Sequence, residues 1–324
     1  MNNDSKYIFV TGINGIIGAH ISKRLLDIGY KVIGIGRSKE CSLIHPSLVY
    51  LQADMNDSDK IESILKNYKI YAVIHLAAIV HKKSNDLTYT SYERINYLAS
   101  KSLFKICSEN SVKKILFAST IEVYGNQDAD IIDESRECNP GSYYGQTKLA
   151  AEKSLLSLAE DGDFNYAIMR FAPVYSKEFT LNIDRRIYLF KNSVAYYFQE
   201  GAYSFNFCSV ENITDFITAY LSKERLESGI FNISDSGNVS VKRVIELEKT
   251  YGALKIAVKL PYNICKVLIG IFERFCRRVL RKETGISIYN FNKLFKSTVY
   301  ANKKAKGIVE QFKWNIENTR YKRH

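Results

Sequence analysis

Tyr144 and Lys148 form the pair of side chains best suited to acid–base chemistry in this sequence. Residues four apart share one face of a helix, where a lysine ammonium stabilises a tyrosine phenolate and lowers the tyrosine pKa from its reference value of about 10. Such a tyrosine acts as a general acid or base near neutral pH. The Tyr-x-x-x-Lys spacing occurs six times in the chain, so its surroundings must single out one pair.

Position in the chain favours Tyr144, because it follows a strand-ending Ser119-Thr120 pair by a short loop. Ligands of parallel sheets bind at the carboxyl ends of the strands, where Thr120 would stand. We therefore predict Thr120, Tyr144 and Lys148 as catalytic residues. Glu122 is a further candidate for an active-site base, and polar support of its own loop is the alternative role of that carboxylate.

Three glycines near the N-terminus predict a phosphate-binding turn. Gly12, Gly15 and Gly18 follow the apolar run 8–10 at three-residue spacing and lead into a predicted helix over 19–28. They would permit a tight turn, a close approach of the backbone to a pyrophosphate, and close packing of the helix on its strand. The pyrophosphate of a dinucleotide would lie at the helix N-terminus, where unpaired N–H groups favour an anion. A structural turn in some other α/β protein is the alternative if this spacing stands alone.

A strand-then-helix rhythm embeds both features in one fold. Further apolar runs at 31–35, 48–51, 72–76, 114–118 and 166–170 read as strands, with helices predicted between most of them. This alternation predicts an α/β fold with a Rossmann-type, doubly wound parallel sheet. We expect residues 1–175 to form the dinucleotide-binding domain, with 207–235 returning to it. Residues 176–206 and 236–324 would form a smaller, mixed substrate lobe.

The composition fits a cytoplasmic protein with a substantial core. The 324-residue chain enters its first predicted strand after residues 1–6 without a signal sequence, and no apolar run approaches the roughly 18 residues of a membrane span. Its six cysteines form no Cys-x-x-Cys pair and show no histidine spacing typical of a zinc site. We therefore expect reduced cysteines and no bound metal.

The net charge of +12 belongs to the C-terminal part of the chain. Residues 242–324 hold 20 Lys and Arg against 6 Asp and Glu, an excess of 14 that leaves −2 for the first 241 residues. We expect no nucleic-acid partner, because no binding motif and no stacking platform accompany these charges. An anionic small substrate or an acidic membrane surface accounts for the charge equally well.

Several longer motifs run through the predicted domain. They are TGINGIIG at 11–18, ADMND at 53–57, HLAA at 75–78, Asn96, STIEVYG at 119–125, YGQTK at 144–148 and RFAPVY at 170–175, with a weaker match at 208–213. Their order and spacing over about the first 175 residues resemble those of the extended short-chain dehydrogenases/reductases, in the nucleotide-sugar epimerase/dehydratase family.

The resemblance implies an NAD(P) cofactor and a nucleotide-diphosphate sugar as substrate. Besides the three glycines, it implies cofactor contacts for Asn14, Ile16, Ile17, Arg37, Ser38, Asp54, Met55, Leu76, Ala77, Ala78, Tyr144, Lys148 and Val174. It implies substrate contacts for Val80, His81, Thr120 and Tyr144. Asn96 would either form a hydrogen bond near the site or pack its own helix. We also expect a homodimer.

The implied reaction is reversible hydride transfer at sugar C4, catalysed by a 4-epimerase or a 4-keto reductase of surface polysaccharide biosynthesis. Thr120 would bind the reacting oxygen while Tyr144 moves the proton. Family dehydratases carry Asp-Glu after the active-site threonine, whereas this chain has Ile121-Glu122. A dehydratase or decarboxylase that uses Glu122 is the alternative within enzymes. A non-catalytic NADP-binding regulator is the other alternative, which the intact catalytic set disfavours.

The end of the second predicted strand bears on the choice of cofactor. NAD-selective relatives place an acidic residue there, whereas this chain has Gly36-Arg37-Ser38. Gly36 would leave room for a 2′-phosphate, which Arg37 and Ser38 could bind, so NADP is favoured over NAD. The alternative is that Arg37 only stacks on the adenine.

Two other departures concern the diphosphate of the substrate. The asparagine usual after the sixth strand is replaced near Ala172, and Phe205 stands where an arginine is expected. The resemblance therefore requires new diphosphate contacts, for which Arg185, Arg186 and the basic C-terminal part are the candidates.

Residues 262–282 form a helical stripe with an apolar and a basic side. The apolar residues are Ile264, Val267, Leu268, Ile271, Phe272, Phe275 and Val279, and the basic ones are Lys266, Arg274, Arg277, Arg278 and Arg281. We expect this helix to pack on the core of the substrate lobe. A helix lying on a membrane surface is the alternative, because the stripe is both basic and amphipathic.

Overall fold

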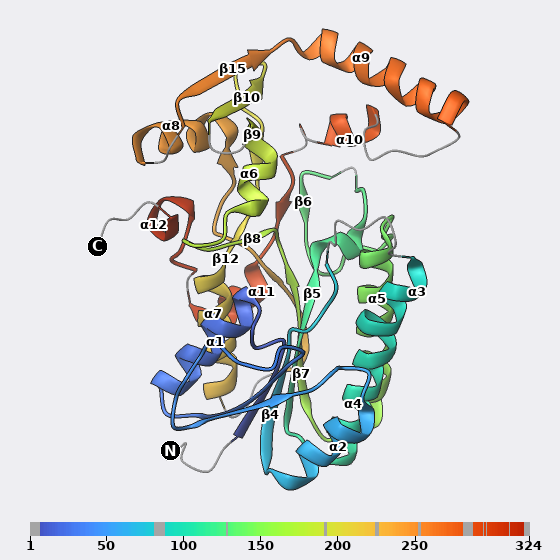
Figure 1. Cartoon of the computed structure of the whole chain (residues 1–324), viewed down its shortest axis with the longest axis vertical. Coiled ribbons are helices and arrows are strands. Elements are labelled where there is room, and N and C mark those ends of the chain that lie inside the picture. The colour runs from blue at the N-terminus through green and yellow to red at the C-terminus, as the bar shows by residue number, and fades with distance from the viewer. Residues whose placement is uncertain are drawn as a thin grey trace.

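The computed structural model describes residues 7–80, 88–127, 129–190, 193–223, 227–251, 254–280, 288–293, 295, 297–310 and 312–320. Its largest element is a seven-stranded sheet in the order β13-β7-β5-β4-β1-β2-β3, paired in parallel throughout (Figure 1). The strands are β1 (Tyr7–Thr11), β2 (Lys31–Gly36), β3 (Leu48–Gln52), β4 (Ile70–His75), β5 (Lys114–Thr120), β7 (Asn165–Phe171) and β13 (Gly229–Ile233). The predicted doubly wound parallel sheet is confirmed.

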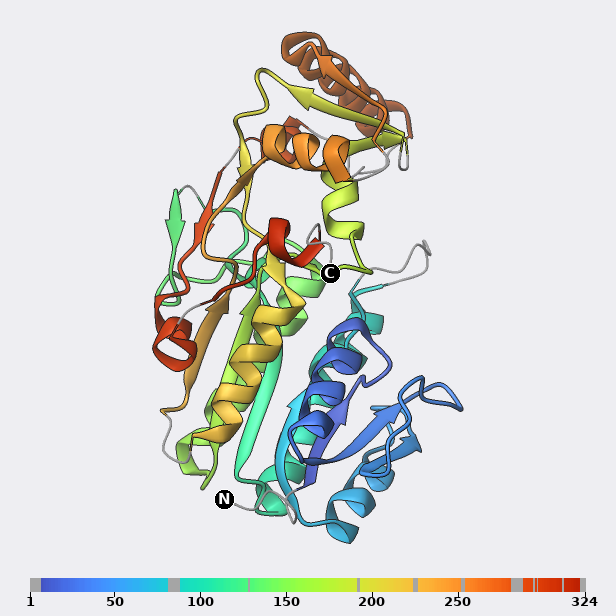
Figure 2. The same ribbon diagram turned by 90° about the vertical axis from the view of Figure 1, so that its left-hand side faces the viewer.

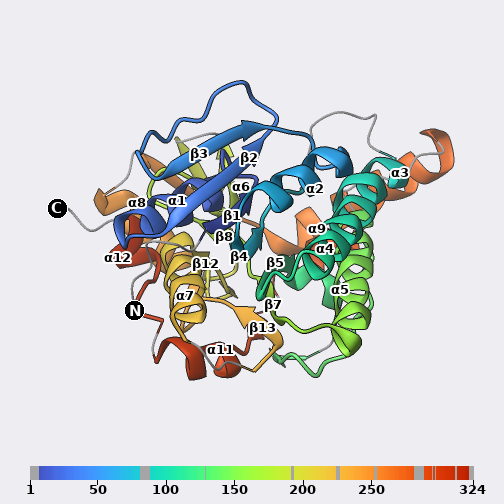
Figure 3. The same cartoon turned by 90° about the horizontal axis from the view of Figure 1, so that it is seen from below.

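Helices cover both faces of this sheet (Figure 3). One face carries α1 (Ile16–Asp27), α7 (Val210–Ser222) and α11 (Lys303–Val309), and the other carries α2 (Ser58–Asn67), α4 (Ala99–Glu109) and α5 (Tyr143–Asp161). Successive strand residues alternate between the two cores: Ile8 and Val10 lie in the first, and Phe9 lies in the second. A sheet buried on both faces explains why its strands read as continuous apolar runs.

The sheet reverses its strand order at β1. This strand pairs with β2 on one side and with β4 on the other, so the chain crosses over β1 before forming the second half of the sheet. The loops that follow β1 and β4 therefore leave the sheet at its switch point, the position where such sheets bind ligands. The glycine turn follows β1 directly, at this switch point.

A second unit stands beyond the carboxyl end of the sheet (Figure 2). It consists of a three-stranded sheet, β15-β10-β9, with helices around it. Its elements are α6 (Leu181–Ile187), β9 (Tyr188–Phe190), β10 (Val194–Phe198), α8 (Val241–Tyr251), β15 (Ile256–Leu260), α9 (Tyr262–Phe275) and α10 (Ile288–Lys293). It has a core of its own, which includes Tyr175, Phe198 and Val244. This separate core supports the predicted substrate lobe, and its assignment to substrate stays a prediction.

The C-terminal segment returns to the large sheet. In α11, Ala305 and Ile308 are buried in the same core as α7, so this part of the expected lobe segment 236–324 lies against the cofactor-binding half instead. The cause is that α7 presents a further apolar face, which α11 covers.

Short elements complete the described part of the chain. They are α3 (Tyr89–Tyr92), η1 (Glu93–Leu98), η2 (Ile121–Tyr124), β6 (Ile131–Ile132), β8 (Val174–Tyr175), β11 (Ser204–Phe205), β12 (Cys208–Ser209), β14 (Val239–Ser240), η3 (Cys276–Leu280), β16 (Val299–Tyr300) and α12 (Ile316–Arg320). β8 pairs with β12, β11 with β14, and β6 with β16. The β6–β16 pair joins the loop before α5 to the C-terminal part of the chain.

The predicted packing of the 262–282 stripe is wrong. Its apolar residues are 43% to 62% exposed, and Gly270 is the buried residue of α9. The helix packs on the lobe through a different side, which includes Cys265 and Ile269. Its stripe therefore faces outward. No helix in the described ranges is long and apolar enough to span a membrane.

Candidate active site

The start of α5 is fixed by a capping arrangement next to the predicted catalytic residues. The Ser142 hydroxyl accepts a hydrogen bond from Gly145 N at 3.1 Å and donates one to Glu122 Oε2 at 2.8 Å. A Cβ added at Gly145 would lie 2.8 Å from the carbonyl oxygen of Glu122, so the helix rests directly on the segment after β5. Glu122 thus positions the first two turns of α5, which carry Tyr144 and Lys148.

Thr120 and Tyr144 lie beside each other although their segments are apart in sequence, since the Thr120 side chain affects the pKa of Tyr144. Thr120 ends β5, and its hydroxyl also accepts from Glu122 N at 3.2 Å. Burial raises the pKa of Tyr144 above its usual value, the charge of Glu122 raises it further, and the polar Thr120 side chain lowers it. The prediction that Lys148 sets a lowered Tyr144 pKa is wrong, since burial is the largest effect and favours the neutral phenol.

Lys148 lies completely inside the fold, one helical turn after Tyr144. Its side chain is 1% exposed, and its Nζ lies 4.2 Å from the centroid of the Phe117 ring. Burial lowers the pKa of Lys148 to about 7, although the nearby Glu152 carboxylate raises it. A buried lysine and a half-buried tyrosine with strongly shifted pKa values, next to a strand end, are typical of a catalytic site.

A buried chain of hydrogen bonds holds the end of β4 against the end of β1. Ser100 donates to the Asn96 carbonyl, so it accepts from His75 Nε2 at 2.8 Å, and His75 Nδ1 accepts from Thr11 at 2.7 Å. The Thr11 oxygen accepts from the backbone N–H groups of residues 76 and 77, each at 3.1 Å. Burial lowers the pKa of His75 to about 3, and Lys148 lowers it further, so His75 stays neutral. These bonds place the predicted cofactor residues Leu76 and Ala77 over the glycine turn.

A buried ion pair lies beneath the catalytic residues. Arg170 donates two hydrogen bonds from Nε to Glu152, at 3.1 and 3.2 Å, and a third from Nη2 at 2.6 Å. Ser119 also donates to Glu152, and the Arg170 guanidinium lies 4.8 Å from the Tyr124 ring centroid. Sequence reasoning missed Glu152, whose spacing of four from Lys148 was the available signal. The pair ties β5, α5 and β7 together under the site.

The glycine turn has the geometry predicted for a phosphate cradle. Gly12 has a φ of +72°, and a Cβ there would meet Ala77 N at 3.0 Å. A Cβ at Gly18 would lie 2.2 Å from the Gly12 oxygen, so any side chain would separate α1 from the turn. Gly15 stands at the N-cap of α1, followed by the predicted contacts Ile16 and Ile17. The backbone N–H groups at this end of a twelve-residue helix suit a pyrophosphate.

The residues predicted to contact the adenosine of the cofactor lie around the loop after β2. Tyr50 donates to the Ser38 carbonyl at 2.5 Å, and Asn14 donates to the Glu40 carbonyl at 3.1 Å. The space beside Gly36 is partly filled, because an added Cβ would lie 3.1 Å from the Tyr50 hydroxyl. The expected room for a 2′-phosphate directly at Gly36 is therefore reduced.

The pKa of Asp54 reveals two positive charges near the residues predicted to contact the adenosine. Its pKa is lowered by hydrogen bonds from Asn56, against the effect of burial, and further by the charges of Arg37 and Arg94. Arg37 is exposed, as is Arg94, a residue of η1 that the sequence motifs did not single out. Met55, the other predicted adenine contact, is buried. Two arginines thus lie near the predicted adenosine end.

The remaining predicted residues follow the ends of β4 and β7. Asn96 is buried and exchanges two hydrogen bonds with the backbone of Ile79, at 2.8 and 2.9 Å, so it holds the loop that carries Ala78 and Val80. Val80 is 45% exposed. Val174 lies in β8, and His81 is outside the described residues. Within the described ranges no cluster of three metal-ligating side chains occurs.

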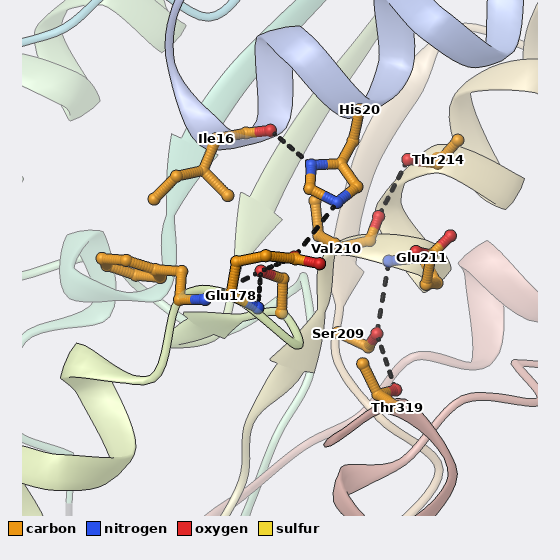
Figure 4. A network of polar contacts seen from close by, with 10 residues as sticks. Ile16, His20, Glu178, Ser209, Val210, Glu211, Thr214 and Thr319 are labelled. Atoms are coloured by element: carbon orange, nitrogen blue, oxygen red, sulfur yellow. Dashed lines mark hydrogen bonds and ion pairs between the residues drawn. The ribbon is translucent and has the colours of Figure 1, made fainter. Parts of the chain in front are cut away.

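Polar contacts also border the N-terminal turn of α1 (Figure 4). His20 is 2.9 Å from the Ile16 carbonyl oxygen and 3.8 Å from Glu178 Oε2. In the same region Ser209 caps α7 by accepting from the N–H of residue 211, and it lies 3.1 Å from Thr319. The predicted lobe segment 176–206 and the C-terminal α12 therefore both reach the carboxyl edge of the sheet.

Comparison with known proteins agrees with this site. Residues 8–234 match the NAD dependent epimerase/dehydratase family. The chain is 28% identical over 276 residues to a UDP-glucose 4-epimerase of Vibrio cholerae, covering 82% of this chain and 81% of that protein. It is 31% identical over 179 residues to the bifunctional protein GAL10 of Pachysolen tannophilus, covering 51% of this chain and 26% of that protein.

A solved structure shares the whole fold. MoeE5 in complex with UDP-glucuronic acid and NAD superposes with a TM-score of 0.73 at 23% identity, covering 97% of both chains. The glycine turn, the half-buried Tyr144 and the buried Lys148, and the match over residues 8–234 agree with one another. The chain therefore belongs to the NAD dependent epimerase/dehydratase family, and it is a nicotinamide-dependent enzyme of that family.

Proposed function

We propose that this enzyme moves hydride reversibly at C4 of a nucleotide-diphosphate sugar, as a 4-epimerase or a 4-keto reductase. The observation that carries the proposal is that Thr120, at the carboxyl end of β5, lies beside Tyr144, with Lys148 buried one helical turn further along α5. The named activity of the V. cholerae relative and the ligands of MoeE5 support a UDP-sugar as substrate. From the family resemblance we propose a role in surface polysaccharide biosynthesis.

Each catalytic residue has a distinct role in this proposal. The nicotinamide of the bound cofactor supplies the hydride acceptor or donor. Thr120 orients the sugar oxygen, and Tyr144 gives or takes its proton. Because its pKa is raised, Tyr144 is protonated at neutral pH and suited to donate a proton to a ketone oxygen, as the reductive direction requires. Lys148 holds the nicotinamide ribose beside it.

A dehydratase or decarboxylase mechanism receives less support from the same segment. Ile121 stands next to Thr120, is 9% exposed, and has no group that could protonate a leaving hydroxyl. Glu122 already accepts the hydrogen bond of the Ser142 cap. These observations favour a structural role for Glu122 over a catalytic one.

Arg186 is our candidate for the substrate diphosphate. It lies in the last turn of α6, with its guanidinium 5.4 Å from the ring centroids of both Phe205 and Phe207. Burial lowers its pKa, and the charges of Tyr300 and Glu122 raise it, so the guanidinium lies within electrostatic reach of the catalytic segment. The cation thus stands over Phe205, where the family pattern leads one to expect an arginine.

Calorimetric titration with UDP tests this assignment. Arg186→Met should weaken UDP binding by about 10- to 100-fold, the effect of losing a charge-assisted hydrogen bond. The neighbouring Arg185 is exposed, so Arg185→Met is the matched control and should change binding little. Equal losses in both variants would remove Arg186 from the site.

The reaction itself is tested with a nicotinamide cofactor deuterated at C4. A reductase should consume NADH or NADPH in a one-to-one ratio with a 4-keto nucleotide sugar and place deuterium at sugar C4. An epimerase should interconvert UDP-glucose and its C4 epimer without net cofactor consumption. If neither reaction occurs and no deuterium reaches C4, the proposal is wrong.

A further inference from the structure

The outward face of α9 and η3 is the largest run of exposed apolar side chains on any helix of the described chain. Ile264, Val267, Leu268, Ile271, Phe272, Phe275 and Val279 are each between 43% and 62% exposed. They recur at intervals of three and four residues, so they share one face of the helix. Contiguous apolar surfaces of this kind mark interaction sites.

The exposed face does not hold α9 in place, because the helix packs on the lobe through a different face. Cys265 and Ile269 pack against the core of the lobe, and Gly270 faces Ile288 of α10. α9 stands at the end of the molecule farthest from the N-terminus (Figures 1 and 2). The exposed face is therefore open to a large, flat partner.

Charge decides which partner suits it. Arg274 and Arg278 are exposed, Lys266 is half-buried, and Glu273 is the only acidic residue between 262 and 280. The Glu273 carboxylate accepts a hydrogen bond from Ile288 N, so it is directed to the lobe. The face thus combines apolar side chains with positive charge. A second copy of this chain would bring the same positive charges together, whereas an anionic lipid surface would neutralise them.

We propose that α9 lies in the interface of an anionic bilayer, with its apolar face among the acyl chains and Arg274 and Arg278 at the phosphate groups. A helix of fourteen residues is too short to span a bilayer, so it lies in the plane of the membrane. β15, which leads into α9, exposes two more apolar residues, Ile256 and Val258. This surface is independent of the chemistry at Tyr144.

Sedimentation of the full chain with vesicles tests the proposal. Binding is expected to phosphatidylcholine vesicles that contain about 30% phosphatidylglycerol, to weaken as salt is raised, and to be much lower without the anionic lipid. The double variant Leu268→Asp/Ile271→Asp should lose binding. Arg274→Gln/Arg278→Gln should weaken it about fivefold per charge removed, the value of about 1 kcal/mol for each basic residue near the surface.

Matched controls separate this face from general adsorption of a basic protein. Ile44→Asp replaces a 95% exposed apolar residue elsewhere, and Lys101→Gln/Lys105→Gln removes two exposed charges from α4, so both should bind as the wild type does. All variants should keep the wild-type melting temperature, because the substituted side chains are exposed. Ile271→Trp should show fluorescence quenched by brominated lipids, whereas Ile44→Trp should not.

Three results would overturn the proposal. The wild type could fail to bind anionic vesicles at low salt. Leu268→Asp/Ile271→Asp could bind as tightly as the wild type. Light scattering could show a wild-type dimer that this variant dissociates while no vesicle binding occurs, which would make the face an interface between copies of the chain.

Discussion

At the scale of single residues, the proposed proton transfer depends on the hydroxyl group of Tyr144. Tyr144→Phe removes the hydroxyl but keeps the half-buried ring. We expect turnover to fall by about 10²-fold or more, the usual effect of losing a general acid or base, while binding of the dinucleotide stays within a few-fold of wild type. Steady-state kinetics and cofactor titration measure the two quantities. Unchanged turnover would remove Tyr144 from catalysis.

Lys148 leads to a prediction about pH. Its pKa is lowered from 10.5 to about 7 in the folded chain, so between these values the unfolded chain binds one more proton than the folded chain does. The free energy of unfolding of the wild type should therefore rise with pH, by up to about 1.4 kcal/mol per unit from this group. Lys148→Met lacks this dependence. Urea denaturation from pH 7.5 to 9.5 should show the free energy of unfolding of the wild type rising relative to that of Lys148→Met. A difference between the two that stays constant with pH would contradict a buried lysine with a lowered pKa.

Arg37 bears on the choice between NADP and NAD. Arg37 is exposed near Asp54, and its neighbour Arg94 adds a second positive charge. If Arg37 binds a 2′-phosphate, Arg37→Ala should weaken NADPH binding by roughly 1.5 to 3 kcal/mol more than NADH binding. Fluorescence titration with both cofactors measures this difference. Equal losses would mean that Arg37 does not read the phosphate, and bound NAD would then be the better proposal.

At the scale of elements, two helices of the lobe place a leucine in opposite environments, one exposed and one buried. Leu268 of α9 is 59% exposed, whereas Leu247 of α8 is 4% exposed. Leu268→Ala should change the free energy of unfolding by less than about 0.5 kcal/mol, and Leu247→Ala should lower it by about 2 to 5 kcal/mol. Chemical denaturation of both variants tests this contrast. A large loss of unfolding free energy in Leu268→Ala would instead support packing of the apolar stripe on the core of the lobe.

The element α5 shows how local signals and tertiary contacts combine. Its cap could be anticipated, because Ser142 is a preferred N-cap residue directly before the helix. The acceptor for the Ser142 hydroxyl, Glu122, could not, because the two residues are joined only by the approach of α5 to the end of β5. The sequence therefore suggested Glu122 as a base, whereas in the structure its carboxylate binds the N-cap residue of the helix that carries Tyr144.

At the scale of the whole molecule, the C-terminal segment completes the main core. Ile308 and Phe312 are buried in the core that includes α1 and α7, and Trp314 donates to Asp215 at 2.9 Å. Deleting residues 303–324 should expose the outer face of α7 and leave its polar partners unpaired. We expect the shortened chain to lose cooperative unfolding and bind an apolar dye. A soluble, cooperatively folded product with wild-type melting temperature would contradict this role.

The sequence by itself determined the parts of this protein that depend on local patterns. Apolar runs of three to five residues, glycines at three-residue spacing and the Ser-Thr strand end are readable because backbone geometry demands those residue types at those places. The parallel sheet, the tight glycine turn after β1 and the approach of Thr120 and Tyr144 to one end of the sheet could therefore be predicted.

Tertiary structure alone decided the properties that depend on burial and on long-range contact. An amphipathic stripe has the same sequence whether it packs or stays exposed, so only the fold reveals that α9 turns its apolar face outward. The pKa of Tyr144 is raised because desolvation outweighs the neighbours that spacing suggests. The ion pair of Glu152 with Arg170 joins residues whose strand and helix meet only in the folded chain. Periodicity records which residues can share a face, and three-dimensional packing settles what each face meets.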